Sequence, residues 1–150
     1  MTTPKPHDQV AHSSQKKRDA LRDAVVNPSL AHPPGDSLRE MFLTWVDRFT
    51  VWHLRILAIL DDPKGWFAAR GRPFPAFMTS SLGNVLTEAY PELKDQRSFY
   101  DLIAKDLWNS GLVNTDGLHA MMSAGGAGAS RTTDIGKEFL RFVTEPTAGK

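Results

Sequence analysis

The last third of the chain, residues 97–143, most constrains the fold, because it contains an ordered series of helical and extended segments. An amphipathic run over residues 98–109 predicts a helix, and Gly111 suits the left-handed position just after a helix end. Strand character is present in residues 112–113, 118–122 and 130–132. Thr133 is placed to cap a final helix that ends at Phe142. The order is therefore helix, strand, glycine-containing loop, strand, helix.

The N-terminal region predicts a flexible arm. Residues 1–14 are polar and contain two prolines, so we expect disorder there. Residues 16–26 predict a short helix, which Asn27-Pro28 ends, and residues 31–35 read as a linker. The predicted organisation is an arm over residues 1–36, a domain over residues 37–143 and a flexible tail over residues 144–150.

Apolar residues recur every three to four positions through residues 38–60, which predicts helix. Ser37 and Glu40 have capping-box spacing, so a helix is expected to begin there. Thr50 can cap a second helix, although one long helix over residues 38–60 remains an alternative. Asp62-Pro63 ends the helical pattern, and a loop is predicted over residues 63–75. Ser80 or Ser81 then begins a helix that ends at Tyr90.

Composition sets broad limits on the class of protein. The 150 residues suit one domain, and the chain has no cysteine, which excludes disulfides and thiolate metal ligands. No secretory signal is recognisable, and the apolar run over residues 51–60 is too short to cross a bilayer. We therefore expect a cytoplasmic protein with no membrane partner. Net charge is +1, but residues 79–143 carry six basic and eight acidic side chains.

Several landmarks together resemble the winged helix-turn-helix superfamily. They are the Ser81-led helix, the helix that ends at Gly111-Leu112-Val113, and Thr133-x-x-Gly136 at the start of the last helix. Within that superfamily these landmarks are most similar to those of MarR-like regulators, and the resemblance covers residues 50–143. It implies a mainly α fold, a winged helix-turn-helix core with a small two-stranded β-hairpin, and duplex DNA binding.

The chain departs from that pattern in two respects. The loop over residues 123–129 is uncharged where a MarR-like wing carries charge, and the presumed recognition helix contains Asp101 and Asp106. The chain also resembles a group of small bacterial proteins through Trp52–Leu57, Asp62-Pro63 and Phe99–Ile103. No activity is known for that group, so this resemblance predicts no function.

Two clusters and one single residue are candidates for contact with DNA or a partner. On the helix over residues 98–109 and just before it, the outward residues are predicted to be Arg97, Asp101, Ala104, Lys105 and Trp108. The loop over residues 63–75 holds three basic and three aromatic residues and no acidic one, and its candidates are Lys64, Trp66, Arg70 and Arg72. Arg131 follows the glycine-containing loop. The structural alternatives are a mixed-charge helix face, and aromatic residues that cover the edge of the core.

Catalytic and metal chemistry have little support in the sequence. His53 would need a nucleophile or carboxylate within reach, and Asp47, Asp61 and Asp62 are the available partners nearby. The five histidines lack ligand spacing, so no metal or cofactor is predicted. Neither do we expect an enzyme.

Two functions remain open. The first is a DNA-associated transcriptional regulator, with double-stranded DNA as partner and dimerisation as a corollary. The second is a protein–protein interaction module, with another protein or a second copy as partner. The fold resemblance favours the first function, and the acidic C-terminal half favours the second.

Overall fold

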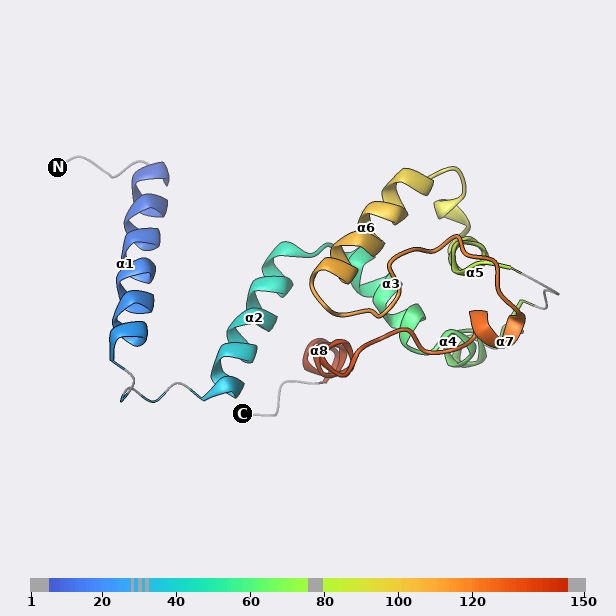
Figure 1. The fold of residues 1–150 in the computed structure, drawn as a ribbon. Helices are drawn as coiled ribbons and strands as arrows, with labels where there is room; N and C mark the ends of the chain where they lie inside the picture. Colours follow the sequence, from blue (N-terminus) through green and yellow to red (C-terminus); the bar gives the residue numbers. More distant parts are fainter. Residues whose placement is uncertain (1–5, 28, 30, 32, 76–79, 146–150) are drawn as a thin grey trace. The chain divides into compact units, whose positions relative to one another are not determined.

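The computed structural model describes residues 6–27, 29, 31, 33–75 and 80–145 (Figure 1). The chain divides into two compact units, residues 1–41 and 42–150. The helices are α1 Pro6–Val26, α2 Pro34–Arg48, α3 Val51–Asp61, α4 Pro63–Ala69, α5 Leu82–Ala89, α6 Arg97–Asn109, α7 Ala124–Ala127 and α8 Asp134–Thr144, with a 3₁₀ turn at Pro91–Leu93.

The first unit contains α1 and the start of α2. The helix α1 begins at Pro6, well before the predicted start at Lys16, so the disorder expected up to Ser14 is not seen over residues 6–14. Proline suits a helix start because its missing N–H would be unpaired there in any case. The part of the arm before Pro6, and the tail after Glu145, lie outside the described residues.

In the second unit α3 is the central helix, and α4, α6 and α8 all contact it (Figure 1). Its inward residues Ile56, Leu57 and Ile59 are completely buried. This explains why α3 is nearly apolar on all sides, as a buried helix requires. Phe42 and Trp45 of α2 lie in the same unit and pack against Phe139 of α8, with ring centroids 5.3 and 5.4 Å apart respectively.

The chain from residue 34 to residue 61 forms two helices rather than one. Thr50 is extended and precedes α3, so the prediction of a second cap at Thr50 is confirmed. The capping box predicted at Ser37 is wrong, because α2 begins at Pro34 and Ser37 lies inside it.

The predicted loop over residues 63–75 contains a helix, α4. Pro63 is its first residue, and the Asp62 carboxylate accepts a hydrogen bond from the Gly65 N–H at 3.0 Å. Proline was interpreted as the end of one helix, but it also begins the next. Trp66 and Phe67 are buried, so tertiary packing stabilises this short helix.

The predicted helices on either side of the 3₁₀ turn are confirmed. Ser81 caps α5 by accepting from the Asn84 N–H at 3.3 Å. After α6, Gly111 has φ 78°, and its N–H donates to the Trp108 carbonyl at 3.0 Å. The Leu112 N–H donates to the Leu107 carbonyl at 3.0 Å, which completes a Schellman motif.

The predicted two-stranded β-hairpin is wrong, and with it the winged-helix fold class. The described residues contain no strand, only isolated antiparallel bridges between Ser80 and Met122 and between Val113 and Thr132. Met122 pairs with Ser80, two residues before α5, instead of with the segment that leads to α8. The segments predicted to pair with each other in one β-hairpin therefore pair with different parts of the chain. Each of the two pairings is a single bridge and does not continue into a ladder.

The glycine-containing loop is not an extended tip. Ser123 caps the short helix α7 by accepting from the Gly126 N–H at 3.1 Å, and Ala127 is fully buried. A segment predicted to be a loop therefore contributes an alanine to the core. The prediction failed because this helix depends on burial rather than on intrinsic propensity, which is poor for glycine.

Candidate functional site

The basic and aromatic residues around α4 are largely occupied by contacts within the protein. The Arg70 guanidinium lies 3.9 Å from the centroid of the buried Trp66 ring. Arg72 donates to the carbonyls of Glu88 and Ala89 at the end of α5, at 2.7 and 3.2 Å. Lys64 is exposed, and its side chain lies over Gly128. The structure therefore favours the alternative in which the aromatic residues of this segment cover the core.

Arg131 lies against the loop that precedes it. Its Nη2 donates to the Gly126 carbonyl at 2.8 Å and contacts the Met122 sulfur at 3.5 Å. Its Nε is buried and has no hydrogen-bond partner among the described residues. The Arg131 side chain is thus partly buried and hydrogen-bonded to α7.

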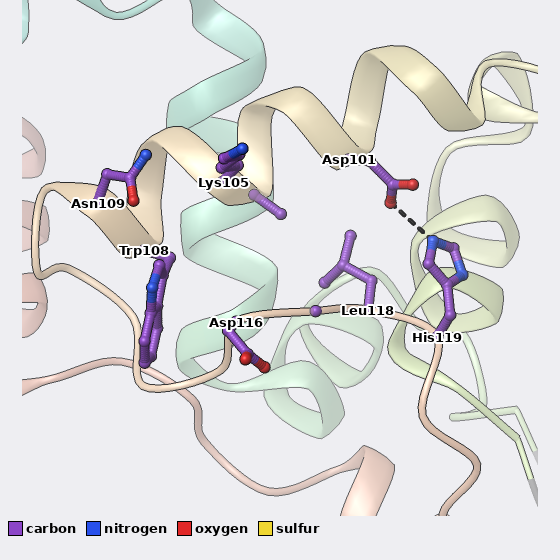
Figure 2. Close-up of a pocket in the computed structure, with 9 residues that line it drawn as sticks. Asp101, Lys105, Trp108, Asn109, Asp116, Leu118 and His119 are labelled. Atoms are coloured by element: carbon purple, nitrogen blue, oxygen red, sulfur yellow. Dashed lines mark hydrogen bonds and ion pairs between the residues drawn. The ribbon is translucent and has the colours of Figure 1, made fainter.

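The residues predicted on α6 lie on or beside an open cleft of about 470 Å³ (Figure 2). Asp101, Lys105 and Trp108 line one wall, and Arg97 lies one turn before Asp101. The opposite wall is the segment over residues 116–119, which passes alongside the helix in Figure 2. The complete lining is Asp101, Ala104, Lys105, Trp108, Asn109, Asp116, Gly117, Leu118 and His119.

One end of the cleft is held together by the Asp101 carboxylate. His119 Nε2 lies 2.7 Å from Asp101 Oδ1 (Figure 2). Arg97 Nε lies 3.5 Å from Asp101 Oδ2. A Cβ at Gly83 of α5 would lie 3.0 Å from His119 Cε1, so the imidazole packs closely against this glycine. Burial, together with the Asp101 charge, raises the pKa of the neighbouring Tyr100. Asp101 therefore holds His119 and Arg97 in place, and both of its carboxylate oxygens already have a partner within the protein.

The other end of the cleft is open and amphipathic. The Trp108 side chain is 43% exposed, although tryptophan normally buries its large ring. Asp116 lies across from Trp108, and Leu118 points from the loop toward α6 (Figure 2). Lys105 is exposed and makes no ion pair within the described part of the chain. An exposed aromatic ring beside separate charged groups suits a ligand that is partly apolar and partly polar.

Sequence reasoning found the α6 side of this cleft and missed the loop side. Ala104, predicted to face outward on α6, is instead buried. Asp116, Leu118 and His119 come from a segment that was partly interpreted as a strand. Asp101 and His119 are 18 residues apart and meet only through the fold. A histidine beside an apolar residue gives no local signal of such a partner.

His53 has a carboxylate partner, but not one of the three suggested by sequence. Its Nε2 lies 2.9 Å from Asp106 Oδ2, and its Nδ1 accepts from the Thr50 N–H at 3.0 Å. The Thr50 hydroxyl also lies 3.0 Å from Nδ1. Because Nδ1 accepts a backbone N–H, the ring is the Nε2–H tautomer and donates to Asp106. The ring is buried and stacks on Phe49, so it stabilises the start of α3 and connects it to α6.

A second cleft, of about 600 Å³, lies between the end of α3 and α8. Lys137 Nζ donates to Asp61 Oδ1 at 2.9 Å, to Thr132 Oγ1 at 2.8 Å and to Ser130 Oγ at 2.9 Å. The three ammonium protons are thus all used. Although Lys137 and Ser130 are close together, an ammonium held by a carboxylate is not a general base. This cluster stabilises the fold.

Asp61 should make the stability of the protein sensitive to acid. Burial alone would raise the pKa of Asp61, but hydrogen bonds from Thr132 and Lys137 outweigh it and lower the pKa below 3.8. A carboxylate whose pKa is lower in the folded state than in the unfolded state stabilises the folded protein at pH values above its unfolded-state pKa. This stabilisation is lost as the pH falls through its folded-state pKa. We expect Asp61→Asn to reduce the urea midpoint clearly at about pH 6 and only slightly at about pH 2.5.

Urea unfolding at the two pH values measures this effect. Asp116→Asn is the matched control, because Asp116 is exposed and makes no hydrogen bond or ion pair among the described residues. Equal losses at both pH values for Asp61→Asn would show that the carboxylate charge is not what stabilises this cluster.

Comparison with protein-family models, with curated proteins and with solved structures found no match. The fold and the cleft therefore define the chain only as a mainly helical protein with an amphipathic surface cleft. Within the described residues, no helix has the length and apolar character needed to cross a membrane. No cluster of histidine and carboxylate side chains suited to a metal ion is present in that same part of the chain.

Proposed function

We propose that this chain is a cytoplasmic protein–protein interaction module that binds a segment of a partner protein in the α6 cleft. The observation that carries the proposal is the exposed Trp108 ring beside a cleft of about 470 Å³. Partly exposed tryptophans at pockets are typical centres of protein interfaces, because they bury a large area at small entropic cost. No catalytic or cofactor role forms part of the proposal.

The cleft suggests the chemistry of the partner segment. The Trp108 ring provides exposed apolar surface for one inserted side chain, whereas Leu118 and Ala104 are buried. The Asn109 amide and the Asp116 carboxylate can hydrogen-bond to peptide groups or to a basic side chain, and Lys105 can pair with an acidic one. These properties favour a short peptide segment that places one apolar side chain between polar groups.

Duplex DNA is the less supported partner. Binding to a duplex requires several cations that face outward and neutralise phosphates. Arg97 pairs with Asp101, Arg72 caps α5, and Arg131 lies against α7. Among the residues predicted to contact DNA, only Lys64 and Lys105 present exposed charges without a hydrogen bond or ion pair in the described structure. Two such lysines are too few for strong duplex binding at physiological salt.

We expect Trp108→Ala to weaken capture of a partner about 30-fold, which corresponds to a loss of about 2 kcal/mol for a central interface residue. The measurement is quantitative pull-down with the full chain, followed by titration of the recovered partner. Met121→Ala is the matched control, because Met121 is exposed but does not line the cleft. Equal capture by the wild type and both variants would show that the cleft is not part of the binding interface.

Fluorescence anisotropy with a random-sequence duplex tests the alternative function. We expect no binding at about 50 or 200 mM salt. Binding that weakens steeply between these salt concentrations, and that Arg97→Ala with Lys105→Ala abolishes, would instead favour the DNA-associated function.

A further inference from the structure

Arginine side chains cover two of the four tryptophan rings of this protein. The Arg55 guanidinium lies over the Trp52 ring, 4.9 Å from its centroid, and the Arg70 guanidinium lies over the Trp66 ring at 3.9 Å. The face of an indole ring carries partial negative charge, so a planar guanidinium both stacks on it and is attracted to it. In both cases the arginine follows the tryptophan by about one helical turn.

The other two tryptophans have no arginine over the ring. Trp45 is buried, and its ring contacts those of Phe42 and Phe139 at centroid distances of 5.7 and 5.4 Å. Trp108 is exposed, and within the described part of the chain neither a cation nor another ring lies over it. Because α6 ends at Asn109, no arginine follows Trp108 by one turn. The Trp108 ring is therefore available to a cation from another molecule.

A carboxylate without a partner lies at the same end of the α6 cleft. Asp116 is on the loop side, across from Trp108, and it is exposed with no hydrogen bond or ion pair among the described residues (Figure 2). Asp101, the other acidic residue of the lining, is already partnered. Lys105 lies one turn before Trp108 on α6, so its charge favours a second cation only on the Asp116 side of the ring. An open indole ring beside an unpaired carboxylate is complementary to a guanidinium.

We infer that the open end of the α6 cleft binds an arginine side chain of the partner segment, which stacks on the Trp108 ring and pairs with the Asp116 carboxylate. This inference rests on the proposed function and specifies the side chain that the cleft receives. The methylene groups of arginine supply the apolar contact with the ring, while the guanidinium reaches the carboxylate. Lysine fits less well, because its ammonium is compact, strongly hydrated and unable to stack.

NMR titration of the full chain with three capped pentapeptides, Gly-Gly-X-Gly-Gly with arginine, lysine or leucine at X, tests the inference. The arginine peptide should shift the Trp108 indole N–H signal, which is identified by its absence in Trp108→Ala. It should bind at least about five-fold more tightly than the lysine or leucine peptide. Asp116→Asn should weaken it about five-fold, whereas Glu138→Gln, an exposed carboxylate of α8 outside the cleft, is the matched control. Equal binding of the arginine and leucine peptides, or no shift up to about 10 mM arginine peptide, overturns the inference.

Partner capture distinguishes the failure of this inference from the failure of the proposed function. Both Trp108→Ala and Asp116→Asn are expected to weaken capture, because each removes one of the two groups that hold the guanidinium. Capture that Trp108→Ala weakens and Asp116→Asn leaves unchanged would retain the α6 cleft as the binding site and overturn the arginine inference. Capture that neither variant changes would overturn the proposed function, and the inference with it.

Discussion

Gly136→Ala is expected to destabilise the second unit by about 3 kcal/mol, and to lower Tm by about 15 °C, although alanine is the better helix former. Alanine in a helix interior is normally favoured over glycine by about 1 kcal/mol. Here a Cβ at Gly136 would clash with the backbone carbonyl of Leu112 and would lie 3.3 Å from the Thr132 Cβ. The Leu112 carbonyl cannot move away easily, because it accepts the Thr133 N–H at 3.0 Å.

Thermal unfolding followed by circular dichroism measures the effect. Gly35→Ala in α2 is the matched control, because a Cβ at Gly35 meets nothing within 4 Å, and it should leave Tm unchanged or slightly raised. A Gly136→Ala protein as stable as the wild type would mean that α8 does not pack so closely on the segment after α6.

Phe139→Ala is expected to cost about 4 kcal/mol, a large part of the stability of a small protein. Phe139 is completely buried, and its ring contacts the rings of Phe42, Trp45 and Phe49 at centroid distances of 5.3, 5.4 and 6.1 Å. Removing it leaves a cavity between α2 and α8 that these rings cannot fill without moving. Urea unfolding measures the loss.

Phe142→Ala is the matched control in the same helix. Phe142 is only half-buried, and Phe42 is its one aromatic contact among the described residues, at 5.3 Å. Its removal should cost about half as much, since less apolar area is lost. Equal losses for the two variants would show that the aromatic cluster does not depend on Phe139 in particular.

Sequence predicted best the features that short-range hydrogen bonds determine. Thr50, Ser81 and Thr133 all precede helices, and the Ser81 and Thr133 side chains accept hydrogen bonds from N–H groups three residues later. Gly111 ends α6 through bonds that reach back at most five residues. The residues involved are neighbours in the chain, so the local pattern is sufficient to predict them. Ser37 is the exception, because Pro34 begins that helix earlier.

Sequence predicted the candidate site only in part. It identified Asp101, Lys105 and Trp108 from the outward face of α6, which helical periodicity reveals. It also grouped Arg70, Arg72 and Arg131 with them, because a sequence does not show which cations have intramolecular partners. Whether those residues contact a partner stays a prediction that the binding experiments test.

The sequence by itself therefore determined where α3, α5, α6 and α8 begin, the absence of cysteine chemistry and the net negative charge of residues 79–143. Tertiary structure decided the contacts between distant segments: His53 meets Asp106 across 53 residues, and Lys137 meets Asp61 across 76 residues. It also decided that Met122 pairs with Ser80, which leaves single bridges where a hairpin was expected. The physical reason is range: caps form within one helical turn, whereas β pairing and buried polar contacts depend on how the whole core packs.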